Sequence, residues 1–132
     1  MDDTNWLSLI NWELERQVLI FVSNEAPDGL YELPSEFARH NLTFPQTIHL
    51  TYNILTELLK EGLIVLEEYT SREQKEPRII EIGNIQEILD NHYNWFPRGK
   101  HLYSIGPTKE GNEYLNNLTE RDKKRLNERL FG

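Results

Sequence analysis

The sequence contains no cysteine, which excludes disulfide bridges, thiolate zinc sites and a thiol nucleophile. No apolar run approaches the roughly 18 residues that a transmembrane helix needs. The acidic start, MDDTNW, also lacks the layout of a signal peptide. Basic residues are scarce, since 14 Lys and Arg stand against 22 Asp and Glu, for a formal net charge of −8. We therefore expect a soluble, cytoplasmic protein with little nonspecific affinity for nucleic acid.

The charge is uneven along the chain. Residues 1–62 hold ten acidic and three basic residues, a net charge of −7. Residues 63–100 have a net charge of −2, and residues 101–132 have a net charge of +1. Because a groove-binding face is a small part of a protein surface, local patches decide whether phosphate can be bound.

What is present suits one domain. The chain has 132 residues, of which 38% are hydrophobic, and no internal repeat is visible. This is enough for a single domain with one core over residues 1–132.

Apolar spacing and turn residues predict a mainly helical chain with a small antiparallel β-sheet, which is an α+β protein. Helices are expected over 4–24 with Asp3 or Thr4 as the cap, over 35–42, 43–60, 84–93 with Asn84 as the cap, 108–117 and 119–131. Strands are expected over 30–33, 63–70, 79–82 and 101–105.

The helix over 43–60 has the clearest signals. Thr43 can cap it, Pro45 sits in its first turn, and Gly62 supplies a left-handed stop. The spacing predicts a buried stripe made of Ile48, Tyr52, Leu55, Leu58 and Leu59. The outward residues are then Gln46, His49, Leu50, Asn53, Glu57 and Lys60, with Thr47 at the side.

Two stretches carry a family resemblance, SEFARHNLTFPQTIHLTYNILTELLKEGLIVLEE and LYSIGPTKEGNEYL. Together with the order of elements, they resemble the winged helix-turn-helix superfamily, in particular small bacterial DNA-binding domains of the MarR and PadR type. In that family the last strand of the wing runs into a Thr-capped helix with a glycine one turn in, and Thr108 and Gly111 fit those places. The resemblance covers residues 10–118 and leaves helical extensions at both ends, including the C-terminal helix 119–131. The segment from Tyr69 to His101 is longer than a usual wing, so the helix over 84–93 is expected to be an insertion in the wing region.

The resemblance implies a small transcriptional regulator that binds double-stranded DNA and forms a homodimer through its terminal helices. Base contacts are then expected from Gln46, Thr47, His49 and Asn53 in the first turns of the 43–60 helix, with Lys60 at its far end. The wing residues Arg72, Lys75 and Arg78 are the expected phosphate contacts. The outward face has no Arg, however, and the net charge of −7 on residues 1–62, which contain the helix-turn-helix, motivates an alternative. In that alternative the chain is a winged-helix protein–protein interaction module that does not bind DNA.

Two other groups have open interpretations. In the loop NWFPRGK, the side chains of Trp95, Phe96, Arg98 and Lys100 could stack on a base or enter a partner's pocket, or the aromatic rings could fold back over the core. In the last helix, Arg121, Arg125 and Arg129 place like charges along one face, which predicts an acidic partner such as the first helix of the same or another subunit. The side chains of Trp6, Trp12 and Leu19 would suit a dimer interface.

No pattern indicates catalysis. The closest pairs of the four histidines are nine residues apart, which is not a metal-ligand spacing. The stretch IGPTKEG lacks the layout of a phosphate-binding loop, and its glycines more simply end a strand and let a helix approach closely. We expect neither a cofactor nor an enzyme.

Overall fold

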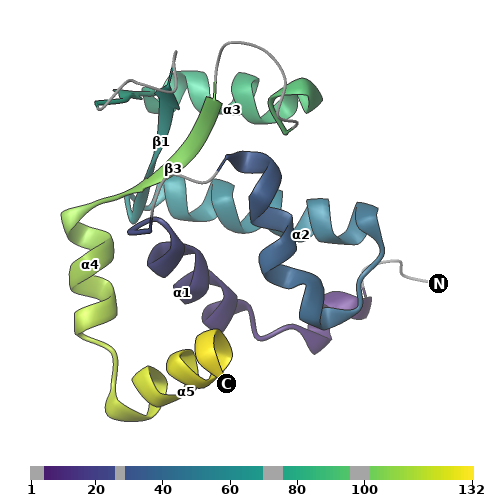
Figure 1. Cartoon of the computed structure of the whole chain (residues 1–132), viewed down its shortest axis with the longest axis vertical. Coiled ribbons are helices and arrows are strands. Elements are labelled where there is room, and N and C mark those ends of the chain that lie inside the picture. Colours follow the sequence, from purple (N-terminus) through teal and green to yellow (C-terminus); the bar gives the residue numbers. More distant parts are fainter. Residues whose placement is uncertain (1–4, 26–28, 70–75, 96–101) are drawn as a thin grey trace.

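The computed structural model describes residues 5–25, 29–69, 76–95 and 102–132, and helices predominate there over a small antiparallel sheet (Figure 1). The α-helices are α1 (Trp12–Val22), α2 (Phe44–Lys60), α3 (Ile82–Asp90), α4 (Lys109–Asn116) and α5 (Glu120–Phe131). The 3-10 helices are η1 (Asn5–Leu9), η2 (Leu30–His40) and η3 (His92–Trp95), and the strands are β1 (Ile64–Tyr69), β2 (Arg78–Ile79) and β3 (Leu102–Pro107). The predicted mainly helical α+β class is confirmed.

The sheet has β1 as its central strand, in the order β2-β1-β3, and β1 pairs antiparallel with both neighbours. Leu66 of β1 lies opposite Ile105 of β3, and both side chains are buried in the core. On the other side of β3, Gly29 forms an isolated bridge with Ser104. The segment before η2 therefore adds a minimal fourth position to the sheet, next to β3.

The strand predicted over 30–33 is wrong, because η2 begins at Leu30. The first 3-10 turn starts directly at Gly29, since the N–H of Glu32 donates to the carbonyl of Gly29 at 2.9 Å. Pro34 has no N–H to offer to a neighbouring strand. Leu30 and Leu33 are both buried, and their spacing of three residues matches a 3-10 turn rather than a strand.

The predicted start and stop of α2 are confirmed. Thr43 forms a capping box with Gln46, Pro45 lies in the first turn, and Gly62 has a φ of 73°. The predicted phase of the helix is only partly right. Its buried residues are Leu50, Thr51, Ile54, Leu55, Leu58 and Leu59.

The error in the predicted phase is clearest at Leu50, which was expected to face outward but is fully buried. Ile48 and Tyr52, expected at the centre of the buried stripe, are half-buried instead. The physical reason is that α2 has apolar residues on two faces. One face meets the main core, and the other faces the segment that contains α3.

The N-terminal region is two helices, not the single helix expected over 4–24. The chain breaks after η1, and Asn11 caps α1, since its Oδ1 accepts from the N–H of Leu14 at 3.1 Å. Asp3 and Thr4, the expected caps, lie outside the described residues. Leu19, expected at a dimer interface, is fully buried within the chain and is not available to a partner.

The helix predicted over 84–93 exists as α3, shifted toward the N-terminus. It runs over Ile82–Asp90 and follows Glu81, so Asn84 lies inside the helix and is not its cap. Ile85 and Leu89 are buried, as their spacing predicted. Figure 1 shows α3 alongside α2, and Ile85 and Leu89 belong to the same hydrophobic core as the buried residues of α2.

The passage from β3 to α4 requires glycine at position 111. Thr108 Oγ1 donates to the carbonyl of Gly62 at 2.9 Å and accepts from the N–H of Gly111, also at 2.9 Å. A Cβ atom on residue 111 would lie 2.1 Å from the carbonyl oxygen of Leu63. The predicted close approach of this helix to the rest of the domain is confirmed.

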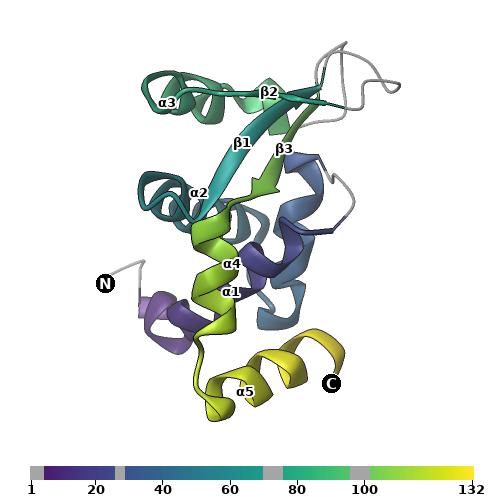
Figure 2. The same ribbon diagram turned by 90° about the vertical axis from the view of Figure 1, so that its left-hand side faces the viewer.

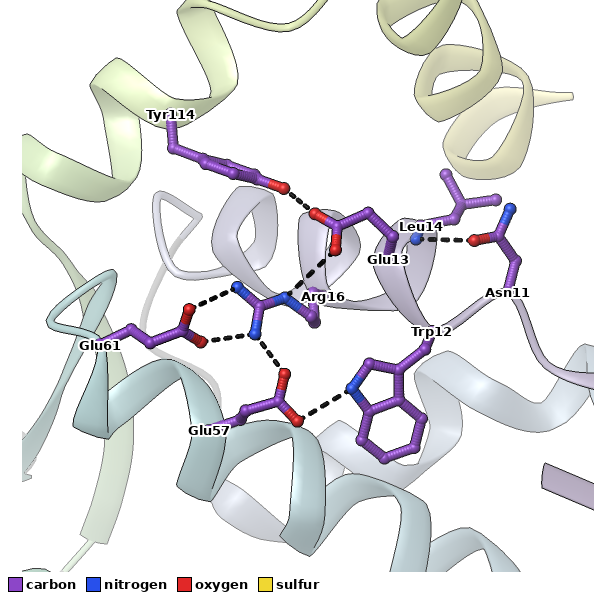
Figure 3. A network of polar contacts seen from close by, with 8 residues as sticks. All are labelled: Asn11, Trp12, Glu13, Leu14, Arg16, Glu57, Glu61 and Tyr114. Atoms are coloured by element: carbon purple, nitrogen blue, oxygen red, sulfur yellow. Dashed lines mark hydrogen bonds and ion pairs between the residues drawn. The ribbon is translucent and has the colours of Figure 1, made fainter. Parts of the chain in front are cut away.

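An ion-pair network joins α1 to α2 (Figure 3). Arg16, which is buried, makes hydrogen-bonded ion pairs with Glu57 and Glu61 near the end of α2. Trp12 Nε1 also donates to Glu57, at 2.9 Å. Hydrogen bonding to Glu61, opposed by burial and supported by Glu57, raises the pKa of Arg16. This flank of α2 is therefore covered by α1.

The two C-terminal helices also contact acidic residues of α1. Tyr114 of α4 donates to Glu13 (Figure 3). Arg129 of α5 donates to both oxygens of the buried Glu15, at 3.0 Å and 2.9 Å. The Nε2 atom of His40 lies 2.9 Å from the same carboxylate. For Arg129, the acidic partner expected for the last helix is thus the first helix of its own chain.

Candidate interaction site

Two of the expected base-reading residues serve to begin α2. The N–H of Thr43 donates to Gln46 Oε1 at 2.9 Å, which completes the capping box. Thr47 Oγ1 donates to the carbonyl of Thr43 at 3.0 Å. Both side chains are half-buried. Because these polar atoms already form hydrogen bonds with the first turn of the helix, they are not free to read a base.

His49, Asn53 and Lys60 do lie away from the core, although local contacts hold two of them. Asn53 Nδ2 donates to the carbonyl of His49 at 2.7 Å. The ring of Trp6 from η1 packs edge-on against the His49 ring, with centroids 6.0 Å apart. Lys60 is exposed in the last turn of the helix.

Glu57 was expected to face outward and to repel phosphate. The structure places its carboxylate against Arg16 and Trp12 instead, so its charge is largely compensated inside the molecule. The Glu57 side chain is still 42% exposed. Its ion pair was not expected, because the spacing on α2 alone carries no information about a base on α1.

The expected wing contacts are only partly described. Arg72 and Lys75 lie outside the described residues. Arg78 is on β2, where its Nε donates to Glu68 Oε1 at 2.9 Å and its Nη2 lies 2.7 Å from the same oxygen. The Arg78 side chain is still 69% exposed, while the carboxylate that it neutralises is buried.

The aromatic loop is described only at its start. Trp95 is buried, and its Nε1 donates to the carbonyl of Leu89 at 2.8 Å. Of the two interpretations of this loop, folding back over the core is therefore correct for Trp95. Phe96, Arg98 and Lys100 lie outside the described residues.

Neighbours flank α2 on both sides. Figure 2 shows α3 above α2, with η1 below it, and α2 does not stand out beyond them. A helix that enters the major groove has to fit a channel about 12 Å wide, so elements beside it restrict the approach. Of the residues expected to read bases, His49 lines a groove beside α2, while Lys60 is exposed at the far end of the helix.

An apolar groove lies between the first half of α2 and the segment that contains α3 and Trp95. It has a volume of about 600 Å³, within the roughly 300–1,000 Å³ of typical ligand sites. Its lining consists of Phe44, Pro45, Ile48, His49, Tyr52, Leu89, Asp90 and Trp95. Sequence analysis missed this groove, although the second apolar face of α2 and the neighbouring Trp95 are the signals that indicate it.

One rim of the groove is a hydrogen-bonded polar cluster. Tyr52 donates its O–H to Asp90 Oδ1 at 2.7 Å. Gln86 Nε2 donates to both Asp90 oxygens, at 2.9 Å and 3.0 Å, and also to the Tyr52 oxygen. The hydrogen bonds from Gln86 and Tyr52 lower the pKa of Asp90, and the bond to Asp90 raises the pKa of Tyr52. The rim therefore carries a stable negative charge.

Other kinds of site find no support in the described ranges. No group of three or more His, Asp or Glu residues there is placed to hold a metal ion. Among the helices within those ranges, none combines the length and apolar character of a membrane span.

Comparison of the chain with models of protein families, with curated proteins and with solved structures finds no match.

Proposed function

We propose that the chain adopts a winged helix-turn-helix fold with an insertion in the wing. Three features support this proposal. The strand arrangement runs from Gly29 to β3 to β1, η2 and α2 follow one another as the two helices of a helix-turn-helix, and α4 follows the last strand through the Thr108 cap. In this fold α2 is the helix that occupies the recognition position.

We further propose that the domain binds a protein partner through the groove between α2 and the inserted segment. The observation that carries this proposal is the groove itself, an open apolar recess lying along the recognition helix. Phe44 is 68% exposed at its edge, so apolar surface there is left uncovered by the described residues. Protein interfaces bury such surface around a few aromatic and aliphatic anchors.

The charge near the groove also favours a protein partner over DNA. No Lys or Arg is among the described residues that line it, and one of its rims carries Asp90. Nucleic-acid affinity depends mainly on Lys and Arg that neutralise phosphates. A phosphate backbone laid along this face would meet the carboxylate of Asp90, and Lys60, the one Lys or Arg of α2, lies at the far end of the helix.

DNA binding as a small regulator is the second candidate, and one observation favours it. His49 and Lys60 remain exposed on the outer side of α2, where a recognition helix presents its contacts. If this candidate is correct, replacing Arg72, Lys75 and Arg78 together by Ala weakens binding to all sequences and flattens its dependence on salt.

Fluorescence anisotropy of a labelled random-sequence duplex separates the two candidates. The full chain is titrated into the duplex at low and at near-physiological salt. We expect no saturable binding at either salt concentration. Saturable binding that collapses as salt rises would contradict the proposal, because it would reveal a phosphate-binding surface on an acidic protein.

A further inference from the structure

The groove differs from a purely hydrophobic contact patch in the chemistry of its rim. Its floor is formed by aliphatic and aromatic groups that include Ile48, Leu89 and Trp95. Asp90 lies at the edge and is exposed, and its carboxylate is oriented by hydrogen bonds from Tyr52 and Gln86. An apolar side chain could therefore enter the groove while a charged neighbour stays in water beside Asp90.

No described residue that lines the groove is a Lys or Arg, and Asp90 gives its rim a negative charge. Helix α3 carries Glu87 and Asp90 and has no Lys or Arg in its sequence. On α2, Glu57 is compensated by Arg16, which leaves Lys60 at the end of the helix remote from Phe44 and Pro45. An anionic ligand would be repelled at Asp90, whereas a cation would be attracted.

We propose that the groove binds a polypeptide segment that inserts an aromatic or aliphatic side chain and places an adjacent Lys or Arg against Asp90. This inference rests on the proposed function and specifies the chemistry of its partner. A polypeptide fits because the groove is open and bounded by two helices, so that a chain can run along it while one side chain enters. The anchor contributes most of the affinity, and the ion pair at the exposed rim adds specificity.

The chain offers matched controls for both parts of this proposal. Phe44 and Ile82 are the first residues of α2 and α3 and are 68% and 69% exposed, but only Phe44 lines the groove. Asp90 and Glu87 are exposed acids of the same helix, and of these two only Asp90 lines the groove. The pairs Phe44→Gln with Ile82→Gln and Asp90→Asn with Glu87→Gln therefore separate local from general effects.

The experiment selects a displayed library of random 12-residue peptides on the full chain. Enriched peptides are then synthesised, and their affinities are measured by fluorescence anisotropy with each variant. We expect enriched peptides to combine a bulky apolar residue with a neighbouring Lys or Arg. Phe44→Gln should weaken binding about 10-fold, which corresponds to ~1.4 kcal/mol of lost apolar burial. Ile82→Gln should leave binding unchanged.

The rim is tested by the second pair of variants. Asp90→Asn should weaken binding about 3- to 5-fold, as expected for an exposed ion pair, and Glu87→Gln should have a much smaller effect. Replacing the peptide's Lys or Arg by norleucine should remove the difference between Asp90→Asn and the unmodified chain. This loss of coupling identifies a direct contact and not a general field effect.

Three outcomes would overturn the inference, and they differ in what they say about the proposed function. Peptides that need Phe44 but lack a basic residue, or that bind Asp90→Asn equally well, would refute the cation contact and leave the groove as a protein-binding site. Peptides that are insensitive to Phe44→Gln would place binding elsewhere on the surface. No enrichment at all would count against both the inference and the proposed site.

Discussion

Replacing Arg129 by Met tests the buried ion pair that fastens α5 to α1. Glu15 is 1% exposed, and Arg129 supplies two of the hydrogen bonds to its carboxylate. Removing one partner of a buried pair costs roughly 3–5 kcal/mol, because the remaining charge is left in a poorly hydrated place. Met keeps most of the aliphatic length, so the change removes mainly the charge and its donors.

The position of the pair sets an upper limit to this cost. Arg129 lies in the last turn of a terminal helix, so α5 can detach and let water reach Glu15. Docking of α5 rests mainly on Leu126, and burial of one leucine contributes about 1.5–3 kcal/mol. We therefore expect a loss of about 3 kcal/mol, with hydrogen exchange of α5 amides accelerated more than that of α2.

The assay is urea unfolding at pH 7, followed by tryptophan fluorescence, for Arg129→Met, Glu15→Gln and the double variant. With an m-value of about 2 kcal/mol/M, the single Arg129→Met variant should lower the midpoint by about 1–2 M. The double-mutant cycle should give a coupling energy of about 2 kcal/mol. A coupling below about 0.5 kcal/mol would refute the reasoning, because it would mean that the two groups do not form a buried pair in solution.

Three other changes probe the rest of the domain. Arg16→Met should cost about 2 kcal/mol in thermal or urea unfolding, since it leaves three carboxylates of α1 and α2 together, although their partial exposure keeps the loss below that of a fully buried pair. Gly111→Ala should destabilise by about 1–3 kcal/mol despite the better helix propensity of alanine, because the new Cβ would meet the Leu63 carbonyl; an unchanged melting temperature would argue against this close approach. Burial raises the pKa of the Glu67 carboxyl above its ordinary value of 4.5, so the folded state binds the carboxyl proton more tightly than the unfolded chain does. Once the pH exceeds about 4.5, the ionised carboxylate therefore lowers the stability of the folded state. Glu67→Gln should therefore stabilise the protein at pH 7, with a gain that disappears as the pH falls below about 4; a gain independent of pH would contradict the assignment.

Local signals predicted the helices and their ends well where the chain supplies its own caps. Thr43, Thr108 and Thr119 each accept the hydrogen bond expected of an N-cap, and Gly62 takes the expected left-handed conformation. These signals depend on neighbours within three or four residues, so they survive any tertiary arrangement.

Signals that depend on distant parts of the chain were not available from the sequence. The spacing on α2 gave Ile48 and Tyr52 as core residues because the position of α3 was unknown, and it therefore placed Leu50 on the outside. Glu57 was expected to face outward without an ion-pair partner, because Arg16 is 41 residues away in the sequence and its position could not be foreseen. The groove could not be predicted for the same reason, since it forms where α2 meets α3 and Trp95, which are distant in the sequence.

The groove also changes the meaning of the family resemblance. A helix in the recognition position was expected to present Gln46, Thr47, His49 and Asn53 to DNA. Gln46 completes the capping box, and Thr47 donates to the carbonyl of Thr43, so both serve the start of α2. Trp6 packs against His49, and Asn53 donates to the carbonyl of His49 in its own helix. Whether such a helix binds a nucleic acid or a protein depends on its surroundings as much as on its shape.

The most direct test of the central claim is a comparison of partner retention by three forms of the full chain. Immobilised wild-type protein, Phe44→Gln and Ile82→Gln are each incubated with a lysate of the source cells, and retained proteins are quantified by mass spectrometry. We predict that at least one protein is retained by the wild type and by Ile82→Gln but is lost from Phe44→Gln. Equal retention of every protein by all three forms would contradict the account, because the groove would then have no part in binding.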